Sequence, residues 1–501
     1  MNLLGRVRAL SELLPRDELE CLLQQEYKGL SKGRIELLQK VLSKKENVVL
    51  TSAEIRKLNR LEEQLISEVM LISIEGRYDR VVGAEIIRAF KKYVFVRALA
   101  STGQLDLAVY YAKKLLRKAK FYQLDELIFL LSQFLEHHYS FVIFDTQKSD
   151  TYGEVFDTSL SSILTKRKVS KLYYDFINRV VNNKSFADRE EKNVYEKRIQ
   201  NEMPVIDKST SSSIVQRVFS NKYYYYLLVG DYKRSYEISN QAVLFYQANF
   251  PNVELHILLF RLMRAVSSIY LNQYDQARFD LVYLSQLNMT QGSHHWNSVW
   301  SYYFTLEMLS QNYESSATIL MNITSGKALT KLDEVWLQQW RIRSAYIHFL
   351  SKIGYVDLSS AGRRRVPNFK LGKFLNEVPH YSKDKRGMNI SILIAQFIIL
   401  LADQKYGKLI DRAESLDKYS YRHLKNDQTL RSNCFIRMLL SLVKAEFNPI
   451  RAERYAAKYI KRLESTEMNL NEYSAEIEII PYEQLWKIIL AITKPMQRKR
   501  A

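Results

Sequence analysis

Glycine and proline are scarce in this sequence of 501 residues. It holds 15 glycines and 8 prolines, where average usage would give about 35 and about 25. Proline and glycine are unfavourable inside helices, and turn-rich β structure depends on them. Their scarcity favours long uninterrupted helices, so the sequence predicts an all-α fold.

Cysteine and long apolar runs are also lacking. Cys21 and Cys434 are the two cysteines, and their spacing forms no metal or redox motif, which predicts ordinary buried thiols in a reducing compartment. The most apolar run, 390–402, is shorter than the ~20 residues that a membrane-spanning helix needs, so it predicts a buried helix. No apolar run follows the basic residues of 1–8. We therefore expect a cytoplasmic protein without a transmembrane segment.

Motifs that carry known chemistry are missing as well. The patterns GxGxxG, GxxxxGK[ST], HExxH, GxSxG and CxxC do not occur. His137-His138 and His294-His295 are adjacent pairs, and neighbours on a helix point about 100° apart, so one metal rarely takes both. We predict no catalytic residue, no cofactor and no metal site, and a protein that is not an enzyme.

What the sequence does contain is an aromatic pattern that recurs about every 40 residues. Tyr232, Tyr274, Tyr313 and Tyr355 are 42, 39 and 42 residues apart, and the first three are followed one helical turn later by small residues. A fixed period of about 20–50 residues indicates a repeat architecture. Similar positions occur before and after this stretch of the sequence. Together, the predicted structural anchors are Leu105, Tyr232, Tyr274, Tyr313, Tyr355, Tyr406 and Phe447.

Local signals place several helix boundaries. Thr51 and Glu54 match a capping box at a helix start. The stretch 100–105 predicts a helix end and a tight turn, after which a second helix begins. The serine-rich run 207–213 is the best linker or long-loop candidate in the chain.

The pattern resembles the tetratricopeptide repeat. Gly230-Asp231-Tyr232 is followed by Ser235, Ser239 and Ala242, and Leu105 is followed by Ala108 and Ala112, as at the turn and second helix of that family. The period here is near 40 residues instead of the family's ~34. The resemblance implies a right-handed α-solenoid of antiparallel helix pairs with a long concave surface for protein segments.

A second resemblance covers shorter stretches near the C-terminus. The segments 369–379, 383–389 and 476–482 are similar to uncharacterised helical-repeat proteins of Bacteroidetes-type bacteria. This resemblance implies a bacterial cytoplasmic protein and carries no activity.

Composition and rhythm predict five parts of the chain. These are an N-terminal helical region (1–90), a first helical-repeat segment (91–206), central tetratricopeptide-like repeats (214–356), a basic insertion (357–390), and C-terminal helical repeats with a cap (391–501).

The basic insertion interrupts the period of about 40 residues between anchors. Between 361 and 387 eight basic residues stand against two acidic ones, within a chain of net charge +20. Arginine and lysine in a loop can hold phosphate or carboxylate, although a solvated loop that only lengthens one repeat has the same composition. The candidate partner or anion-binding residues are Arg363, Arg364, Arg365, Lys370, Lys373, Lys383, Lys385 and Arg386.

Two function classes fit these features. The first is a non-enzymatic scaffold that binds an unknown protein or peptide, with an acidic partner favoured by the charge, on a helical-repeat surface. The alternative is a nucleic-acid-binding or regulatory protein that uses the basic 361–387 loop, because phosphate binding without sequence preference needs only such a patch.

Overall fold

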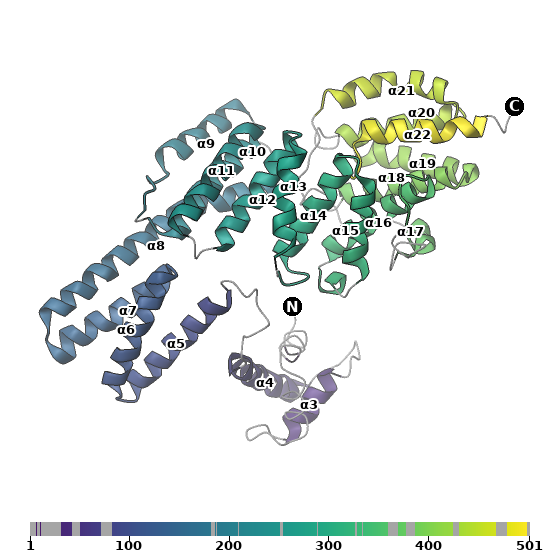
Figure 1. The fold of residues 1–501 in the computed structure, drawn as a ribbon. Helices are drawn as coiled ribbons and strands as arrows, with labels where there is room; N and C mark the ends of the chain where they lie inside the picture. The colour runs from purple at the N-terminus through teal and green to yellow at the C-terminus, as the bar shows by residue number, and fades with distance from the viewer. Residues whose placement is uncertain are drawn as a thin grey trace. The chain divides into compact units, whose positions relative to one another are not determined.

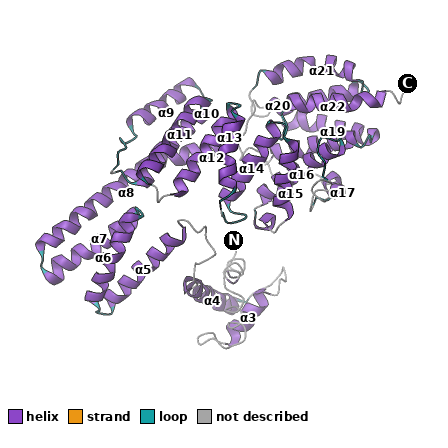
Figure 2. Cartoon of the chain, in the orientation of Figure 1, coloured by secondary structure: helices purple, strands orange, loops and turns teal. Residues whose placement is uncertain are grey.

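The structure is a computed structural model that describes part of the chain and is helical there. The described residues are 7, 11, 32–42, 51–71, 83–181, 186, 188–208, 210–250, 254–287, 289–325, 328–332, 334–358, 369–376, 386–423, 430–466 and 478–497. None of these residues forms a strand (Figure 2). The expected all-α class is therefore confirmed for them. The chain forms two compact units, Met1–Tyr78 and Asp79–Ala501.

In the first unit, helices α3 (Lys32–Leu42) and α4 (Ser52–Leu71) pack together. The capping box at the start of α4 is confirmed. The backbone N–H of Glu54 donates to the Thr51 hydroxyl at 3.2 Å, and the backbone N–H of Thr51 donates to the Glu54 carboxylate at 2.8 Å. Lys40 of α3 forms an ion pair with Glu54 at 2.8 Å, which links the two helices.

The second unit is a long series of helices (Figure 1). Its first half is built from α5 (Gly83–Ser101), α6 (Leu105–Phe121), α7 (Asp125–His138), the π-helical turn Tyr139–Ile143, α8 (Thr146–Val181), α9 (Arg189–Asn201), α10 (Ser212–Leu228), α11 (Tyr232–Asn249) and α12 (Glu254–Tyr270). Its second half is built from α13 (Tyr274–Ser285), α14 (His294–Leu309), α15 (Tyr313–Ser325), the short 3₁₀ turn Ala328–Lys331, α16 (Glu334–Lys352), α17 (Leu371–Asn376), α18 (Arg386–Ala402), α19 (Tyr406–His423), α20 (Leu430–Lys444), α21 (Pro449–Glu464) and α22 (Tyr482–Gln497).

Helices of this unit pack mainly on their neighbours in the sequence. From α5 to α8, each helix packs on the next one. Helix α8 then packs on α10, and successive helices pack on one another from α10 to α16. Helix α16 packs on α18, and successive helices again pack on one another from α18 to α22. Two helices, α9 and α17, stand beside this succession, since α8 packs on α10 and α16 packs on α18. The chain is thus a succession of packed helix pairs.

One turn geometry joins many of these helices. At eight places in the described chain, a residue with positive φ donates its N–H three residues back, and the next residue donates five residues back. These two bonds define the Schellman motif, which satisfies the last carbonyls of a helix. The expected tight turn at 100–105 is confirmed as one of them. The positive-φ residues are Gly103, Gln123, Gly230, Asn272, Gln311, Gly354, Gln404 and Glu446.

Small residues after these turns are buried between helices, as their spacing predicts. Ala108 and Ala112 on α6 have no exposed surface, and neither does Ala277 on α13. Ser235 on α11 is also fully buried, and its hydroxyl lies 2.8 Å from the hydroxyl of Ser267 on α12. Small side chains let neighbouring helices approach closely, so their burial fits close helix packing.

The serine-rich run 207–213 agrees with the long-loop expectation in its first part, since the described residues 207, 208, 210 and 211 lie between α9 and α10 and outside both helices. Ser212 begins α10, and its backbone N–H donates to the side-chain oxygen of Gln123 at 2.6 Å. The Ser211 hydroxyl donates to the Asp125 carboxylate at 2.6 Å. Serines favour helix starts because their hydroxyls replace missing backbone partners. Here they fasten the start of α10 to the start of α7.

Candidate functional site

The residues of the predicted basic insertion are mostly outside the described part of the chain. Those outside it are Arg363, Arg364, Arg365, Lys383 and Lys385. Lys370 and Lys373 are exposed beside and on the short helix α17, and Arg386 begins α18. The described residues therefore bring only Lys370 and Lys373 into one place.

The predicted anchors lie at the helix-joining turns. Five begin helices, namely Leu105, Tyr232, Tyr274, Tyr313 and Tyr406. Tyr355 and Phe447 come one position earlier, immediately after the positive-φ residue of their turns. Rings from successive turns touch, because Tyr313 and Tyr355 have centroids 5.9 Å apart and Tyr406 and Phe447 have centroids 4.7 Å apart.

A pocket of about 520 Å³ opens at one of these turns, between α9 and the junction of α10 and α11. Its volume is within the range of ligand sites, about 300–1,000 Å³. Helix α9 supplies one wall, and the turn that contains Gly230 supplies the other. The lining residues are Lys192, Glu196, Tyr225, Tyr226, Val229, Gly230, Asp231, Tyr232, Lys233, Arg234 and Leu271.

Helix α9 is fixed against α8 by a cluster of polar and aromatic contacts. Arg179 of α8 pairs with Glu191 at 2.5 Å, and its guanidinium lies 4.8 Å from the centre of the Tyr195 ring. The Tyr195 hydroxyl donates to the Asp175 carboxylate. The N-terminus of α9 is capped by Asp188, which accepts the backbone N–H of Glu191 at 2.8 Å. This anchoring holds Lys192 and Glu196 of α9 over the turn.

The opposite wall of the pocket is ordered by the turn itself. Asp231 caps α11 by accepting the backbone N–H of Arg234 at 3.1 Å, and its carboxylate lies 3.5 Å from the Arg234 side chain. The Arg234 guanidinium lies 5.5 Å from the centre of the Tyr226 ring. The ring of Tyr232 stacks on that of Tyr270, with centroids 4.1 Å apart. The wall is therefore a fixed aromatic surface beside a helix N-terminus.

The pocket has an excess of positive charge. Its three cations face two carboxylates, and Asp231 is already engaged by the cap and by Arg234. Within the described chain, Lys192 and Lys233 form no ion pair. The partial positive charge of a helix N-terminus adds to this field. The pocket can thus hold a carboxylate or phosphate group against tyrosine rings.

Tyr225 of the pocket is not activated for chemistry. Burial, with the nearby charge of Glu196, raises the pKa of Tyr225 to about 12. The phenol therefore stays protonated at neutral pH, where a nucleophile would need a lowered pKa or an adjacent base. The pocket is therefore better suited to binding an anionic group than to nucleophilic chemistry by Tyr225.

A second pocket, of about 350 Å³, lies where the last helix crosses two other turns. Gln311 and Tyr355 come from those turns, and the start of α22 supplies the rest of the lining, which is Pro481, Glu483, Gln484, Lys487 and Ile488. Both pockets are thus formed at helix-joining turns.

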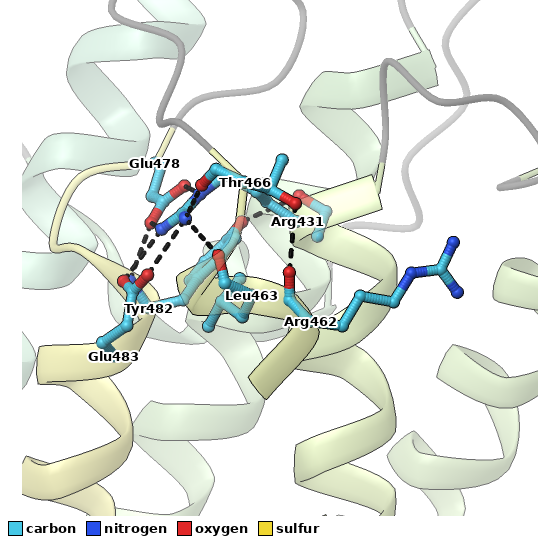
Figure 3. Close-up of polar contacts among 8 residues, drawn as sticks. Arg431, Arg462, Leu463, Thr466, Glu478, Tyr482 and Glu483 are labelled. Carbon is cyan, nitrogen blue, oxygen red and sulfur yellow. Dashed lines mark hydrogen bonds and ion pairs between the residues drawn. The ribbon is translucent and has the colours of Figure 1, made fainter. Parts of the chain in front are cut away.

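A polar cluster around Arg431 is closed, because its groups bind one another within the protein. Arg431 of α20 is buried and binds the Glu478 carboxylate through two nitrogens, at 2.7 and 2.9 Å (Figure 3). It also donates to the Glu483 carboxylate and to the backbone oxygens of Leu463 and Thr466. Burial by itself lowers the pKa of Arg431, but the bonds and charges of both glutamates outweigh it and raise the pKa.

Because its donors are used by the protein, the Arg431 cluster has a structural role. It ties the end of α21 and the start of α22 to α20. The Tyr482 hydroxyl, 2.9 Å from the Ser432 hydroxyl, adds a further bond between α22 and α20. Removing one partner of this buried network would leave a buried charge without its counter-ion, which is strongly destabilising.

Sequence reasoning missed the residues of the larger pocket. In the sequence, Gly230-Asp231-Tyr232 indicates a turn of the repeat pattern, and the adjacent Lys233 and Arg234 carry no signal of a pocket. Lys192 and Glu196 lie in a stretch of weak apolar periodicity, and only their four-residue spacing could have suggested one helix face. The pairing of the two walls is a tertiary feature without a local signal.

Three further findings bear on function. The described residues contain no group of three or more His, Cys, Asp and Glu that could hold a metal ion. No helix in the described part of the chain has both the length and the apolar character needed to cross a bilayer. Compared with protein families, curated proteins and solved structures, the chain matches none.

Proposed function

We propose that the protein is a non-enzymatic interaction scaffold that binds an acidic segment of a partner protein in the pocket between α9 and the α10–α11 turn. The observation that carries the proposal is the combination of an aromatic wall with uncompensated lysines in a ligand-sized pocket. Aromatic rings supply apolar contact area, and lysines with a helix N-terminus recognise carboxylate.

We further propose that the helix pairs are antiparallel and stack into a right-handed, tetratricopeptide-like solenoid. Serial packing of neighbouring helices supports this architecture. So does the spacing of the turns, since the positive-φ residues Gly230, Asn272, Gln311 and Gly354 are 42, 39 and 43 residues apart. In such an array the turn residues recur along one edge, where both pockets would lie.

The test is a selection of binding peptides on the immobilised full chain, followed by affinity measurements. We expect the selected peptides to be rich in Asp and Glu with at least one aromatic or aliphatic residue. Lys192→Glu/Lys233→Glu should weaken their binding by about tenfold or more, since each reversal turns attraction into repulsion.

A matched control uses the same chemistry outside the pocket. Lys197 on α9 and Lys208 in the following loop are exposed and do not line the pocket. Lys197→Glu/Lys208→Glu should leave affinity within about twofold of the wild type, apart from a weak long-range effect that salt removes. Selected peptides that are neutral or basic, or that bind both variants equally, would refute the pocket as the site.

The same material tests the nucleic-acid alternative. Binding of a single-stranded oligonucleotide that falls by orders of magnitude between about 50 and about 200 mM salt would support it. Such binding, lost in Arg363→Ala/Arg364→Ala/Arg365→Ala and unchanged by the pocket variant, would favour the alternative over the scaffold.

A further inference from the structure

An exposed apolar tip joins α7 to α8. Four consecutive residues there, Phe141, Val142, Ile143 and Phe144, are 69%, 44%, 50% and 78% exposed. Runs of this kind are avoided on the surfaces of water-soluble domains unless they have a function. We name Phe141–Phe144 the apolar tip.

The apolar tip is held in place by a well-bonded turn. The backbone N–H of Asp145 donates to the carbonyl of Tyr139 at 2.9 Å, which closes the π-helical turn. Asp145 then caps α8 by accepting the backbone N–H of Lys148 at 3.0 Å. Phe144 itself has φ of +59°, an uncommon conformation for a bulky residue. The backbone is fixed while the four side chains face water.

Two cations lie at the start of the turn that carries the apolar tip. The ammonium groups of Lys113 and Lys148 are 5.2 and 5.3 Å from the centre of the Tyr139 ring. Asp145, the one carboxylate in the turn, pairs with Lys148 at 2.7 Å. Long basic side chains placed behind an apolar insertion can reach the level of lipid headgroups.

The neighbouring helices α5 and α6 carry a large share of the chain's charge. Residues 83–121 contain nine basic and two acidic residues, a net charge of +7 (9 − 2) within a chain of +20. Their exposed surface also carries apolar and aromatic side chains, namely Phe90, Val94, Phe95, Leu107, Tyr110, Tyr111 and Phe121. Exposed aromatic residues interspersed with Lys and Arg are typical of surfaces that lie in a membrane interface.

We propose that the α5–α8 part of the protein docks on an anionic lipid bilayer, with the apolar tip inserted and the cations of α5 and α6 facing the headgroups. The apolar tip protrudes and contains no side chain that could hydrogen-bond, so it suits hydrocarbon better than nucleic-acid phosphates. The basic helices beside it add attraction of about 1 kcal/mol for each cation near an anionic surface. Because the described helices do not span a bilayer, this attachment is peripheral.

Vesicle flotation of the full chain tests the proposal. We expect binding to vesicles with about 30% phosphatidylserine and much weaker binding to phosphatidylcholine alone. Phe141→Ser/Phe144→Ser should reduce the partition coefficient by about tenfold or more, because two large apolar side chains no longer leave water. Both side chains are already exposed, so circular dichroism and the melting temperature should not change.

Two further variants separate apolar from electrostatic contributions. Leu244→Ser/Phe279→Ser is the matched control, since these side chains are 58% and 63% exposed on α11 and α13, and its partition coefficient should stay within about twofold of the wild type. Lys114→Gln/Arg117→Gln on α6 should lower binding to phosphatidylserine vesicles by about tenfold and leave binding to phosphatidylcholine unchanged.

A reporter at the apolar tip gives an independent readout. The five natural tryptophans lie between 296 and 486, so Phe144→Trp adds the only one near this turn. On vesicle binding, the added emission should shift to the blue and be quenched by brominated lipids.

Several outcomes would overturn the proposal. They are no binding of the wild-type chain to phosphatidylserine vesicles, equal binding by the Phe141→Ser/Phe144→Ser variant, or unquenched emission from the tryptophan added in Phe144→Trp. A tip variant that loses self-association or a protein partner, while the wild type ignores vesicles, would assign the apolar tip to a protein interface. A failed peptide selection would not affect these results, because the larger pocket is not involved.

Discussion

Two regions of the Asp79–Ala501 unit bury their apolar residues in different ways. From α14 to α22, helices share one continuous core, and every side chain of Ile390–Leu401 is buried. From α5 to α7, the core is small, with buried residues between Ala89 and Leu135. In that region α5 buries Ala89 and Val96 but exposes Val94 and Phe95.

The two regions differ in how the apolar side chains of their helices are covered. Helices that contact only their neighbours leave apolar side chains at the end of the series uncovered unless a polar cap is present. In the C-terminal region, α22 and the Arg431 cluster close the core. In the N-terminal region, described side chains of α5 and α6 such as Val94, Phe95 and Tyr110 are exposed, and they belong to the proposed docking surface.

The largest expected effect on stability tests the C-terminal region, α14 to α22. Arg431→Met leaves Glu478 as a buried charge without its partner and should lower the free energy of unfolding by about 3–5 kcal/mol. Urea denaturation followed by circular dichroism measures it. Arg431→Met/Glu478→Met should recover part of the loss, because no lone buried charge remains.

Arg437 on the same helix provides the control. Its ion pair with Asp417, at 2.7 Å, is partly exposed, and Arg437→Ala should change stability by less than about 1 kcal/mol. If Arg431→Met were no more destabilising than Arg437→Ala, the cluster would not be what closes the C-terminal core.

A smaller effect comes from His256 of α12, a helix that lies in sequence between the two regions. Burial, then the charges of Arg217 on α10 and Lys166 on α8, lower its pKa to about 4. Its ring centroid is 5.1 Å from that of Tyr246. Since the unfolded chain binds this proton near pH 6.5, His256 stabilises the fold above that pH, and the contribution is lost as pH falls toward 4.

The expected loss between pH 8 and pH 5 is about 2 kcal/mol from this group. His256→Phe keeps an aromatic ring beside Tyr246 and should flatten the dependence of unfolding free energy on pH by that amount. His295→Phe, at an exposed position, should retain the wild-type slope. An unchanged slope in His256→Phe would mean that the ring is not held neutral in the folded protein.

The smallest expected effect on stability tests a feature that the two regions share, the Schellman turn at the end of a helix. Gly103 ends α5 with φ of +82°, and an added methyl group would meet no atom within 4 Å. Gly103→Ala should therefore cost only backbone strain, about 1–2 kcal/mol. Gln404 ends α18 with φ of +56°, and Gln404→Gly should relieve strain and gain up to about 1 kcal/mol.

These two values come from chemical denaturation of the single variants. Opposite signs would show that the turn acts locally, regardless of the core around it. If Gln404→Gly destabilised the protein, its left-handed conformation would instead be fixed by contacts of its side chain.

Much of the helical organisation could be predicted because its signals are local. The capping box of α4, the buried apolar run of α18 and the small residues behind the anchors are all confirmed. Turn positions were harder to predict, since five of the eight Schellman turns use Gln, Asn or Glu where glycine is the usual signal. Tyr355 directly follows the positive-φ residue of its turn, Gly354, whereas Tyr232 stands two positions after Gly230, so this anchor falls one position earlier in its turn.

The candidate site was less predictable because its parts are brought together by tertiary contacts. Lys192 and Tyr226 belong to helices separated by the serine-rich run, and nothing in either segment encodes their approach. Likewise, Phe141–Phe144 reads in sequence like part of a buried helix, and only the packing of α7 on α8 leaves it at an exposed turn. The basic insertion, which sequence composition made prominent, lies mostly outside the described residues.

Helix α22 packs against helices that lie much earlier in the sequence, and this has a consequence for folding. The Gln484 amide donates to the Tyr313 hydroxyl across 171 residues of sequence, and Tyr482 and Ile489 belong to the same core as residues of α14 and α15. An ordinary repeat array can fold from its first repeats onward while it is being synthesised. Here the core that begins at α14 includes side chains of the last helix, so we expect this core to be completed only when α22 is present, and its long-range contacts to slow folding.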